Sequence, residues 1–308
     1  MKIITTIEEM QSYSSELRAN GKSVGFVPTM GALHDGHLSL IRESATNNDI
    51  TIVSIFVNPT QFAANEDLDK YPRTLERDAE LSRANGADII FAPSADEMYP
   101  KSLYVGDGVL DVPFNTACTC SDSGRPMTAP TSCTYVEVHG LTQGLCGKSR
   151  PTHFRGVTTV VAKLFNIVQP RRAYFGQKDA QQLAVISKMV ADLNIPVEII
   201  PCPIVRESDG LAMSSRNVYL SPAEREQAST LYEALTEAET LIKSGERSAE
   251  AVKERLTSIL NTANLGIIDY VEIVDFHTLQ PIATIKPPTL IALAVKFGNT
   301  RLIDNVLI

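Results

Sequence analysis

The stretch F-V-P-T-M-G-A-L-H-D-G-H-L-S-L, residues 26–40, joins an apolar strand to a helix through a turn with glycine and two histidines. His34 and His37 lie three positions apart, so in a helix that begins just after His34 both side chains can face one ligand. A helix N-terminus attracts anions through its free N–H groups and its dipole. Gly31 and Gly36 carry no side chain that would hold a phosphate away. The stretch therefore predicts a site for nucleotide phosphates at a strand end.

The H-D-G-H sequence within this stretch also has an ordinary interpretation. Taken alone, it fits polar residues in a loop between a strand and a helix, with glycines that only make the turn. Its H-x-G-H pattern is similar to the signature of nucleotidyltransferases that attack the α-phosphate of ATP. Motifs elsewhere in the chain are needed to choose between a phosphate site and an ordinary loop.

Composition limits the classes of protein that this chain can belong to. With 308 residues and 44% hydrophobic content, it can bury a large core in one large or two moderate domains. Its net charge of −8 argues against a general nucleic-acid-binding protein, so any polyanion site must be local. The first residues turn acidic before any signal-peptide core, and no apolar run approaches the length of a membrane span. We expect a cytoplasmic protein without nucleic-acid or membrane partners.

Four of the five cysteines fall in one segment: Cys118, Cys120, Cys133 and Cys146. An odd total without a signal peptide argues against a disulfide framework. A zinc site remains an alternative, although Cys118 and Cys120 lack the C-x-x-C spacing of common zinc knuckles. We expect free thiols in a mobile loop.

Strand and helix patterns alternate through the first two thirds of the chain. Apolar runs predict strands at 23–27, 49–57, 88–91, 172–175 and 197–201, and longer periodic runs predict helices at 36–46, 75–85, 156–168 and 180–193. This order predicts an α/β fold with a doubly wound, Rossmann-like parallel sheet. Ligands of such sheets bind outside the carboxyl ends of the strands, where the histidine stretch falls.

Two segments depart from this alternation. Residues 102–132 are rich in Gly, Pro, Ser, Thr and Asp and have no sustained period, which predicts an inserted surface loop that chemistry does not need. Beyond Arg206, polar helices at 222–244 and 249–262 precede short strands at 268–274, 290–297 and 302–304. We therefore expect a first domain over 1–204 and a smaller α+β domain over 205–308.

Three further segments with reactive side chains follow predicted strands or the domain boundary. Gln61 projects a carboxamide from N-P-T-Q-F, which suits a ligand with hydroxyls beside a carboxylate. In G-Q-K-D, Lys178 offers a positive charge and Asp179 could cap the next helix or orient a ribose or Mg²⁺; Gln182 follows on that helix. The segment L-A-M-S-S-R-N, 211–217, offers two hydroxyls and a guanidinium for triphosphate oxygens. Each of them alone would also fit an ordinary polar loop.

Motifs occur in a fixed order over nearly the whole chain: P-T-M-G-A-L-H-D-G-H, F-V-N-P-T-Q-F, Y-P-R-T, S-R-P-T-H-F-R-G-V, F-G-Q-K-D-A-Q-Q-L, D-G-L-A-M-S-S-R-N and R-L-I-D-N. Together they closely resemble the pantoate–β-alanine ligase (pantothenate synthetase) family of the cytidylyltransferase-like superfamily. An ordered set is far more specific than any one of its members.

The resemblance implies a role for each matching position. Gln61 and Gln182 would hold pantoate, and Gln61 would also lie beside β-alanine. His37 would be a proton donor, and the residues that support catalysis would be His34, His37, Lys178, Ser214, Ser215 and Arg216. The ATP site would comprise Met30, Gly31, Ala32, Leu33, His34, Asp35, Gly36, His37, Gly176, Gln177, Lys178, Asp179, Val205, Met213, Ser214, Ser215 and Arg216.

The reaction that the resemblance implies has two steps. Pantoate attacks the α-phosphorus of Mg·ATP to give pantoyl adenylate and pyrophosphate, and the β-alanine amine then displaces AMP. No tightly bound organic cofactor is implied, the metal ligands are unknown, and the family implies a homodimer formed through the larger domain.

The chain departs from the family pattern at two places. Position 146 is Cys where the pattern suggests Glu, and the region 102–132 is longer than the family leads us to expect.

Two other functions stay open at this point. One is another nucleotidyltransferase, which would not be expected to carry the Gln61 and Gln182 pair. The other is a nucleotide-sensing protein without catalysis, which would not need to retain the histidine, lysine and Ser-Ser-Arg set.

Overall fold

The computed structural model describes residues 1–63, 66, 68–100 and 134–308. The loop predicted at 102–132 lies outside the described residues, and so do three of the four clustered cysteines, Cys118, Cys120 and Cys133. None of the helices within the described ranges is both long and apolar enough to cross a bilayer.

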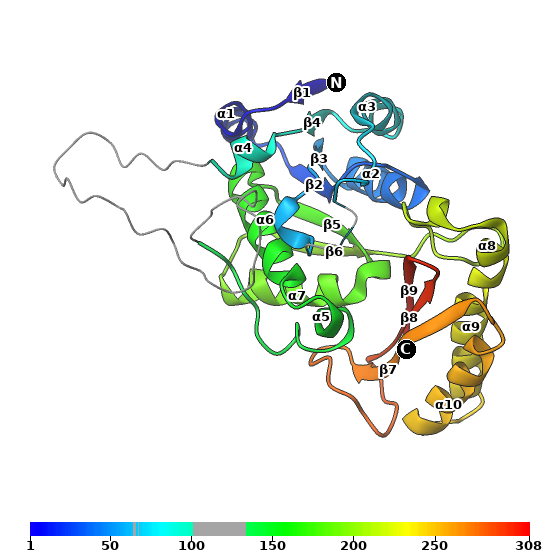
Figure 1. The fold of residues 1–308 in the computed structure, drawn as a ribbon. Helices are drawn as coiled ribbons and strands as arrows, with labels where there is room; N and C mark the ends of the chain where they lie inside the picture. Colours follow the sequence, from blue (N-terminus) through cyan, green and yellow to red (C-terminus); the bar gives the residue numbers. More distant parts are fainter. Residues whose placement is uncertain (64–65, 67, 101–133) are drawn as a thin grey trace, which may run out of the picture.

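A parallel six-stranded sheet forms the centre of the larger part of the molecule (Figure 1). Its strands are β1 (Lys2–Ile4), β2 (Val24–Thr29), β3 (Ile50–Ile55), β4 (Ile89–Phe91), β5 (Arg172–Gly176) and β6 (Glu198–Cys202), in the order β1-β4-β3-β2-β5-β6. After β2, the next strands β3 and β4 are added on one side of β2, and the later strands β5 and β6 are added on its other side. The order therefore reverses between β2 and β5, and such a switch point opens a crevice at the carboxyl ends of the strands.

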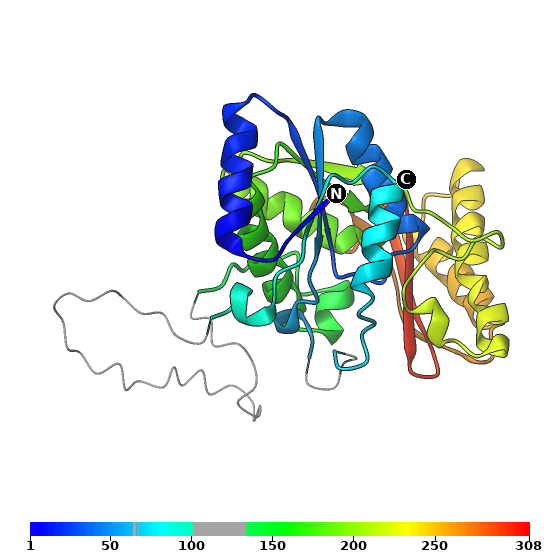
Figure 2. The ribbon, with the colours of Figure 1, turned by 90° about the horizontal axis from the view of Figure 1, so that it is seen from above.

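Helices cover both faces of this sheet (Figure 2). They are α1 (Ile7–Ala19), α2 (Asp35–Asn47), α3 (Leu75–Ala84), α4 (Ala95–Met98), α5 (Leu145–Ser149), α6 (His153–Val168) and α7 (Ala180–Asp192). Successive strand residues point to opposite faces. Phe26 and Ile52 accordingly belong to the core on the α6 side, whereas Val27 and Val53 belong to the core beneath α2. The doubly wound parallel sheet predicted from the sequence is confirmed.

The C-terminal part is an antiparallel sheet with helices on one face. Its strands are β7 (Gly266–Asp275), β8 (Thr289–Phe297) and β9 (Thr300–Leu307), and its helices are α8 (Pro222–Ala228), α9 (Thr230–Lys243) and α10 (Ala249–Leu260). One face of β8 packs with α9 and α10, for example through Leu293. Leu290 and Ala292 instead join the core of the large sheet, so β8 links the two halves.

Several details differ from the prediction. The sequence patterns did not predict β1, α1, α4 or α5. The single helix predicted over 222–244 is two helices that meet at Ser229, whose hydroxyl donates to the Glu226 carbonyl at 3.1 Å. A serine hydroxyl that donates to a backbone carbonyl of the preceding turn competes with the backbone hydrogen bonds of a helix, which favours such a break.

Candidate active site

The turn from β2 to α2 is held by a carboxylate from another element. Asp78 of α3 is buried and accepts hydrogen bonds from the backbone N–H groups of Ala32 and Leu33, both at 2.9 Å. Gly31 lies in the left-handed region with φ +84°, and a Cβ there would lie 3.0 Å from the Asp78 carboxylate. Glycine therefore lets the turn close tightly over Asp78.

The two histidines cap α2 with the same ring atom. His34 Nδ1 accepts from Gly36 N–H at 3.2 Å, and His37 Nδ1 accepts from His34 N–H at 3.4 Å. The helix begins at Asp35, one residue before the predicted range, and the ring centroids are 4.1 Å apart. Because each Nδ1 is an acceptor, the ring proton of each neutral histidine must be on Nε2. Both rings thus carry a donor atom for a ligand.

Both rings are held neutral. Burial, reinforced by the nearby Lys178 charge, lowers the pKa of His34 from 6.5 to about 4. Burial together with His34 and Lys178 lowers the pKa of His37 to about 3. At neutral pH the pair consists of two neutral N–H donors, and the positive charge beside them belongs to Lys178.

Lys178 lies in the turn Gln177–Asp179, directly after β5. The buried Asn305 of β9 donates its side-chain N–H groups to the Gln177 carbonyl at 3.0 Å and the Lys178 carbonyl at 2.8 Å. The C-terminal sheet therefore fixes the backbone of this turn. Asp179 stands at the N-cap of α7, but its side chain makes no capping hydrogen bond.

The Ser-Ser-Arg segment lies opposite the histidines. Met213 N–H donates to the Val205 carbonyl at 3.0 Å, which closes a short hairpin ahead of the serines. Arg216 N–H donates to Ser214 Oγ at 3.2 Å. A Cβ added at Gly36 would lie 3.8 Å from Met213 Cβ, so the hairpin and the start of α2 face each other closely.

These segments surround a cavity of about 240 Å³ at the switch point between β2 and β5. Of the predicted site residues, those that line it are Met30, His34, Gly36, His37, Gln61, Gly176, Lys178, Asp179, Gln182, Val205, Met213, Ser214, Ser215 and Arg216. The cavity lining does not include Gly31, Ala32, Leu33, Asp35 or Gln177. Leu33, for example, is buried in the core beneath α2.

Gln61 is buried at the end of the short helix Pro59–Gln61. Its side-chain nitrogen lies 2.8 Å from the Met30 sulfur, and its side-chain oxygen accepts from Asn58 at 3.3 Å. Gln61 is thereby connected to the turn that carries the histidines. Together with Gln182 it brings two carboxamides to the same cavity.

Arg150 and His153 also line this cavity, although the sequence motifs predicted no role for either residue. Arg150 forms a bidentate ion pair with Glu66, with N–O distances of 2.6 and 2.7 Å. Burial opposes ionisation of Glu66, but the Arg150 hydrogen bonds outweigh it and lower the pKa of this carboxyl. The only signal in the sequence was the motif S-R-P-T-H-F-R-G-V, which contains both residues.

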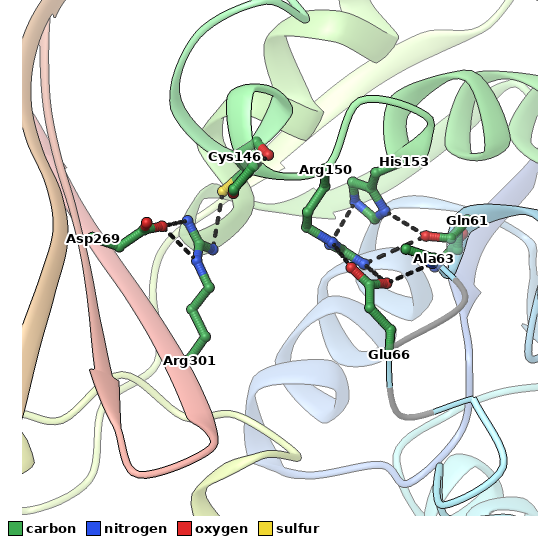
Figure 3. Close-up of polar contacts among 9 residues, drawn as sticks. Gln61, Ala63, Glu66, Cys146, Arg150, His153, Asp269 and Arg301 are labelled. Atoms are coloured by element: carbon green, nitrogen blue, oxygen red, sulfur yellow. Dashed lines mark hydrogen bonds and ion pairs between the residues drawn. The ribbon is translucent and has the colours of Figure 1, made fainter. Parts of the chain in front are cut away.

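Cys146 lies in an adjoining cavity of about 90 Å³, next to the C-terminal sheet. Its thiol accepts from Arg301 at 3.4 Å and lies 3.4 Å from the Tyr270 hydroxyl, while Arg301 is paired with Asp269 (Figure 3). Cys146 is a free thiol, as predicted, but the expected mobile loop is wrong for this residue. It is buried in α5 because Gln181 accepts from its N–H at 2.9 Å and the C-terminal sheet covers its side chain.

The described ranges contain no group of three His, Cys, Asp or Glu side chains arranged to hold a metal ion.

A model of the family described as pantoate-beta-alanine ligase matches residues 2–307. The chain belongs to this family. It is 55% identical to the pantothenate synthetase of Acetivibrio thermocellus over 308 residues, which cover all of this chain and 99% of the relative. It is 54% identical to that of Thermotoga petrophila, with both chains covered completely. The enzyme is therefore a ligase that uses ATP to join pantoate and β-alanine in pantothenate biosynthesis.

Solved structures agree with this assignment. Pantothenate synthetase from Thermus thermophilus superposes with a TM-score of 0.85 at 40% identity, covering 99% of both chains. Pantoate-beta-alanine ligase from Francisella tularensis, complexed with "Beta-gamma ATP and Beta-alanine", superposes with a TM-score of 0.73 at 34% identity, covering 100% of this chain and 97% of that one.

Proposed function

We propose that this ligase works through a pantoyl adenylate, formed and consumed in the cavity between β2 and β5. In the first step a pantoate carboxylate oxygen bonds to the α-phosphorus of ATP while the bond to the pyrophosphate oxygen breaks. In the second step the β-alanine amine bonds to the activated carbonyl carbon, the bond from that carbon to the AMP phosphate oxygen breaks so that AMP leaves, and the amine proton is released to water. The observation that carries this proposal is the gathering of neutral histidine donors, a lysine and the Ser-Ser-Arg segment around one cavity.

Negative charge grows on phosphate oxygens in the first step, so the residues that assist it must donate hydrogen bonds or supply positive charge. His34 and His37 would donate hydrogen bonds from Nε2 to phosphate oxygens; because the His37 ring is neutral, we assign it the role of a hydrogen-bond donor and not of an acid. Lys178 would place its ammonium against the triphosphate, and the remaining donors would be Ser214, Ser215 and Arg216. The start of α2 adds its dipole to the same place.

Pantoate combines a carboxylate and hydroxyls with an apolar carbon skeleton. Gln61 and Gln182 suit the polar groups, because each carboxamide both donates and accepts. Val157, Val160 and Phe62 line the same cavity and suit the apolar carbons. β-Alanine would bind beside Gln61, where its amine can reach the acyl carbon.

ATP would enter as the magnesium complex, with the triphosphate supplying oxygen ligands to the metal.

We further propose that the chain divides into a domain over 1–204 and a smaller one over 205–308. We also propose that it forms a homodimer through the larger domain and that it acts in the cytoplasm. The family of the chain supports these assignments, and gel filtration with light scattering tests the dimer.

The test separates the two steps. Pantoate alone should support exchange of labelled pyrophosphate into ATP, whereas steady release of AMP should require pantoate and β-alanine together. Lys178→Ala should strongly slow the exchange but spare the reaction of synthetic pantoyl adenylate with β-alanine. AMP release without pantoate would contradict the proposed function, and equal loss in both half-reactions would contradict the role given to Lys178.

A further inference from the structure

Arg150, which caps the end of α5, and His153, the first residue of α6, hold the loop that carries Gln61. His153 Nδ1 lies 2.9 Å from the Gln61 carbonyl oxygen, and an Arg150 N–H donates to the same oxygen at 3.4 Å. Arg150 also binds Glu66, whose carboxylate accepts from Ala63 N–H at 3.1 Å, two residues beyond Gln61 (Figure 3). The loop is therefore held at two points, at the Gln61 carbonyl by His153 and Arg150 and at the Ala63 N–H by Glu66.

The hydrogen bonds of His153 fix which ring nitrogen carries the proton. Arg150 can only donate, and it lies 3.1 Å from His153 Nε2, so Nε2 must accept. The proton is then on Nδ1, which donates to the Gln61 carbonyl. Burial, and next the Arg150 charge, lower the pKa of His153 to about 4, which agrees with a neutral ring.

Both groups are already engaged within the protein. All three guanidinium nitrogens of Arg150 have protein acceptors, and its charge is balanced by Glu66. Both nitrogens of His153 are likewise occupied. Although Arg150 and His153 line the cavity, their polar atoms point along the protein network and not to an open subsite.

The network ends at a side chain that faces the substrate site. Gln61 continues from its fixed carbonyl to a carboxamide that contacts Met30 and Asn58 at the cavity wall. α6 also presses against this loop, because a Cβ at Gly156 would lie 2.5 Å from the Thr60 carbonyl oxygen. A shift of the Gln61 backbone would move its carboxamide relative to the histidines across the cavity.

We propose that Glu66, Arg150 and His153 form a positioning network that sets Gln61 for pantoate and β-alanine, with His153 acting through its Nδ1 proton. The inference rests on the role proposed above for Gln61. It assigns these three residues no contact with ATP, so their loss should change the KM values for pantoate and β-alanine selectively.

The test compares three substitutions of one residue. His153→Ala should raise the KM for pantoate about tenfold, as expected for a lost hydrogen bond in a half-buried position, and leave the KM for ATP within about twofold. His153→Asn places an amide N–H where Nδ1 stood and should restore most of the loss. His153→Gln places its N–H where Nε2 stood and should restore little.

A Glu66→Gln variant should raise the pantoate KM in the same direction, since it removes the charge that holds Arg150. The matched control is Glu237→Gln, which removes one half of the Arg255–Glu237 ion pair between α10 and α9, away from the cavity. The control should leave all three KM values unchanged.

Gln61→Ala separates failure of the inference from failure of the role given to Gln61. If Gln61→Ala leaves the KM values for pantoate and β-alanine unchanged, the role of Gln61 is wrong. If Gln61→Ala raises them and His153→Ala does not, only the positioning network is wrong. In the double variant His153→Ala should add little to Gln61→Ala, because it acts through the missing side chain. Rescue by Gln instead of Asn would overturn the inference, since His153 would then act from Nε2.

Discussion

The three half-buried histidines around the cavity use their two ring nitrogens in opposite ways. His34 and His37 accept backbone hydrogen bonds at Nδ1, which leaves the proton on Nε2 toward the cavity. His153 does the reverse, because Arg150 occupies Nε2. The same side chain therefore serves as a ligand donor at the start of α2 and as a structural donor at the start of α6.

The first prediction follows from the proton position on His37. His37→Ala should lower pantoate-dependent ATP–pyrophosphate exchange by about 10²- to 10⁴-fold, the range for a lost donor at a charge-developing centre. His37→Gln should recover part of this rate, since its amide nitrogen reaches the Nε2 position, and His37→Asn should recover less. Circular dichroism checks that each variant folds. Exchange by His37→Ala at the rate of the unsubstituted enzyme would show that the ring does not assist the reaction.

At the scale of one residue, the role of Asp78 could not be predicted from the sequence. Residues 26–40 contain the glycines and histidines that make the turn, so that part of the site could be predicted. The carboxylate that holds the turn comes from α3, more than forty positions along the chain, where it looks like one of several acidic residues on a polar helix. Only the fold brings it to Ala32 and Leu33.

At the scale of elements, the start of α6 and the short helix Pro59–Gln61 depend on each other. Asn58 donates to the Gly156 carbonyl at 3.2 Å, and Gly156 allows the two backbones to approach closely. Sequence periodicity predicted α6 from residue 156, but the structure begins it at His153. The residues that the prediction missed are His153, Phe154 and Arg155, and His153 makes the contact to the Gln61 carbonyl.

The second prediction concerns this close approach. Gly156→Ala would place a Cβ 2.7 Å from the Gln61 Cα, so one of the two elements must move. The KM for pantoate should rise, and stability should fall by about 1–3 kcal/mol as in other overpacked cores. Steady-state kinetics and thermal unfolding measure both effects.

The control for this variant is Gly144→Ala. Gly144 has φ −102°, and a Cβ there meets no atom within 4 Å, so this change should be tolerated. Equal behaviour of the two alanine variants would contradict the role assigned to the contact at Gly156.

The third prediction concerns the link between β9 and the Lys178 turn. Asn305→Ala leaves the Gln177 and Lys178 carbonyls without their side-chain donor. Misplacement of Lys178 should slow adenylate formation by about tenfold to a hundredfold, because positioning dominates such a step. The reaction of synthetic pantoyl adenylate with β-alanine should be nearly unaffected. Lys296→Ala, an exposed change on neighbouring β8, is the control and should alter neither half-reaction.

At the scale of the whole molecule, alternation of short apolar runs and longer periodic runs was enough to predict five of the six strands of the parallel sheet and to point to their carboxyl ends, where the candidate cavity lies. It could not show how the C-terminal sheet completes that site. β9 reaches the Lys178 turn through Asn305, and Arg301 reaches α5 through Cys146. These contacts join residues more than a hundred positions apart, and no local pattern encodes them.

The last prediction concerns the stability of the whole molecule in acid. An unfolded histidine has a pKa near 6.5, whereas burial lowers that of folded His153 to about 4. Above pH 6.5 both states are neutral, so the residue does not affect the free energy of unfolding. Between pH 6.5 and 4 the unfolded chain binds a proton that the folded chain does not. Stability must therefore fall as the pH falls, by up to about 1.4 kcal/mol per pH unit for this residue.

Urea denaturation at pH 7, 6 and 5 measures this effect when the unsubstituted protein is compared with His153→Asn, which cannot take up the proton. The free energy of unfolding should fall less steeply for the variant between pH 6 and 5, by about 1 kcal/mol. His139→Asn is the control, because His139 is exposed. Parallel curves for the unsubstituted protein and His153→Asn would mean that His153 binds its proton equally well in the folded chain, and the neutral ring that joins Arg150 to Gln61 would have to be abandoned.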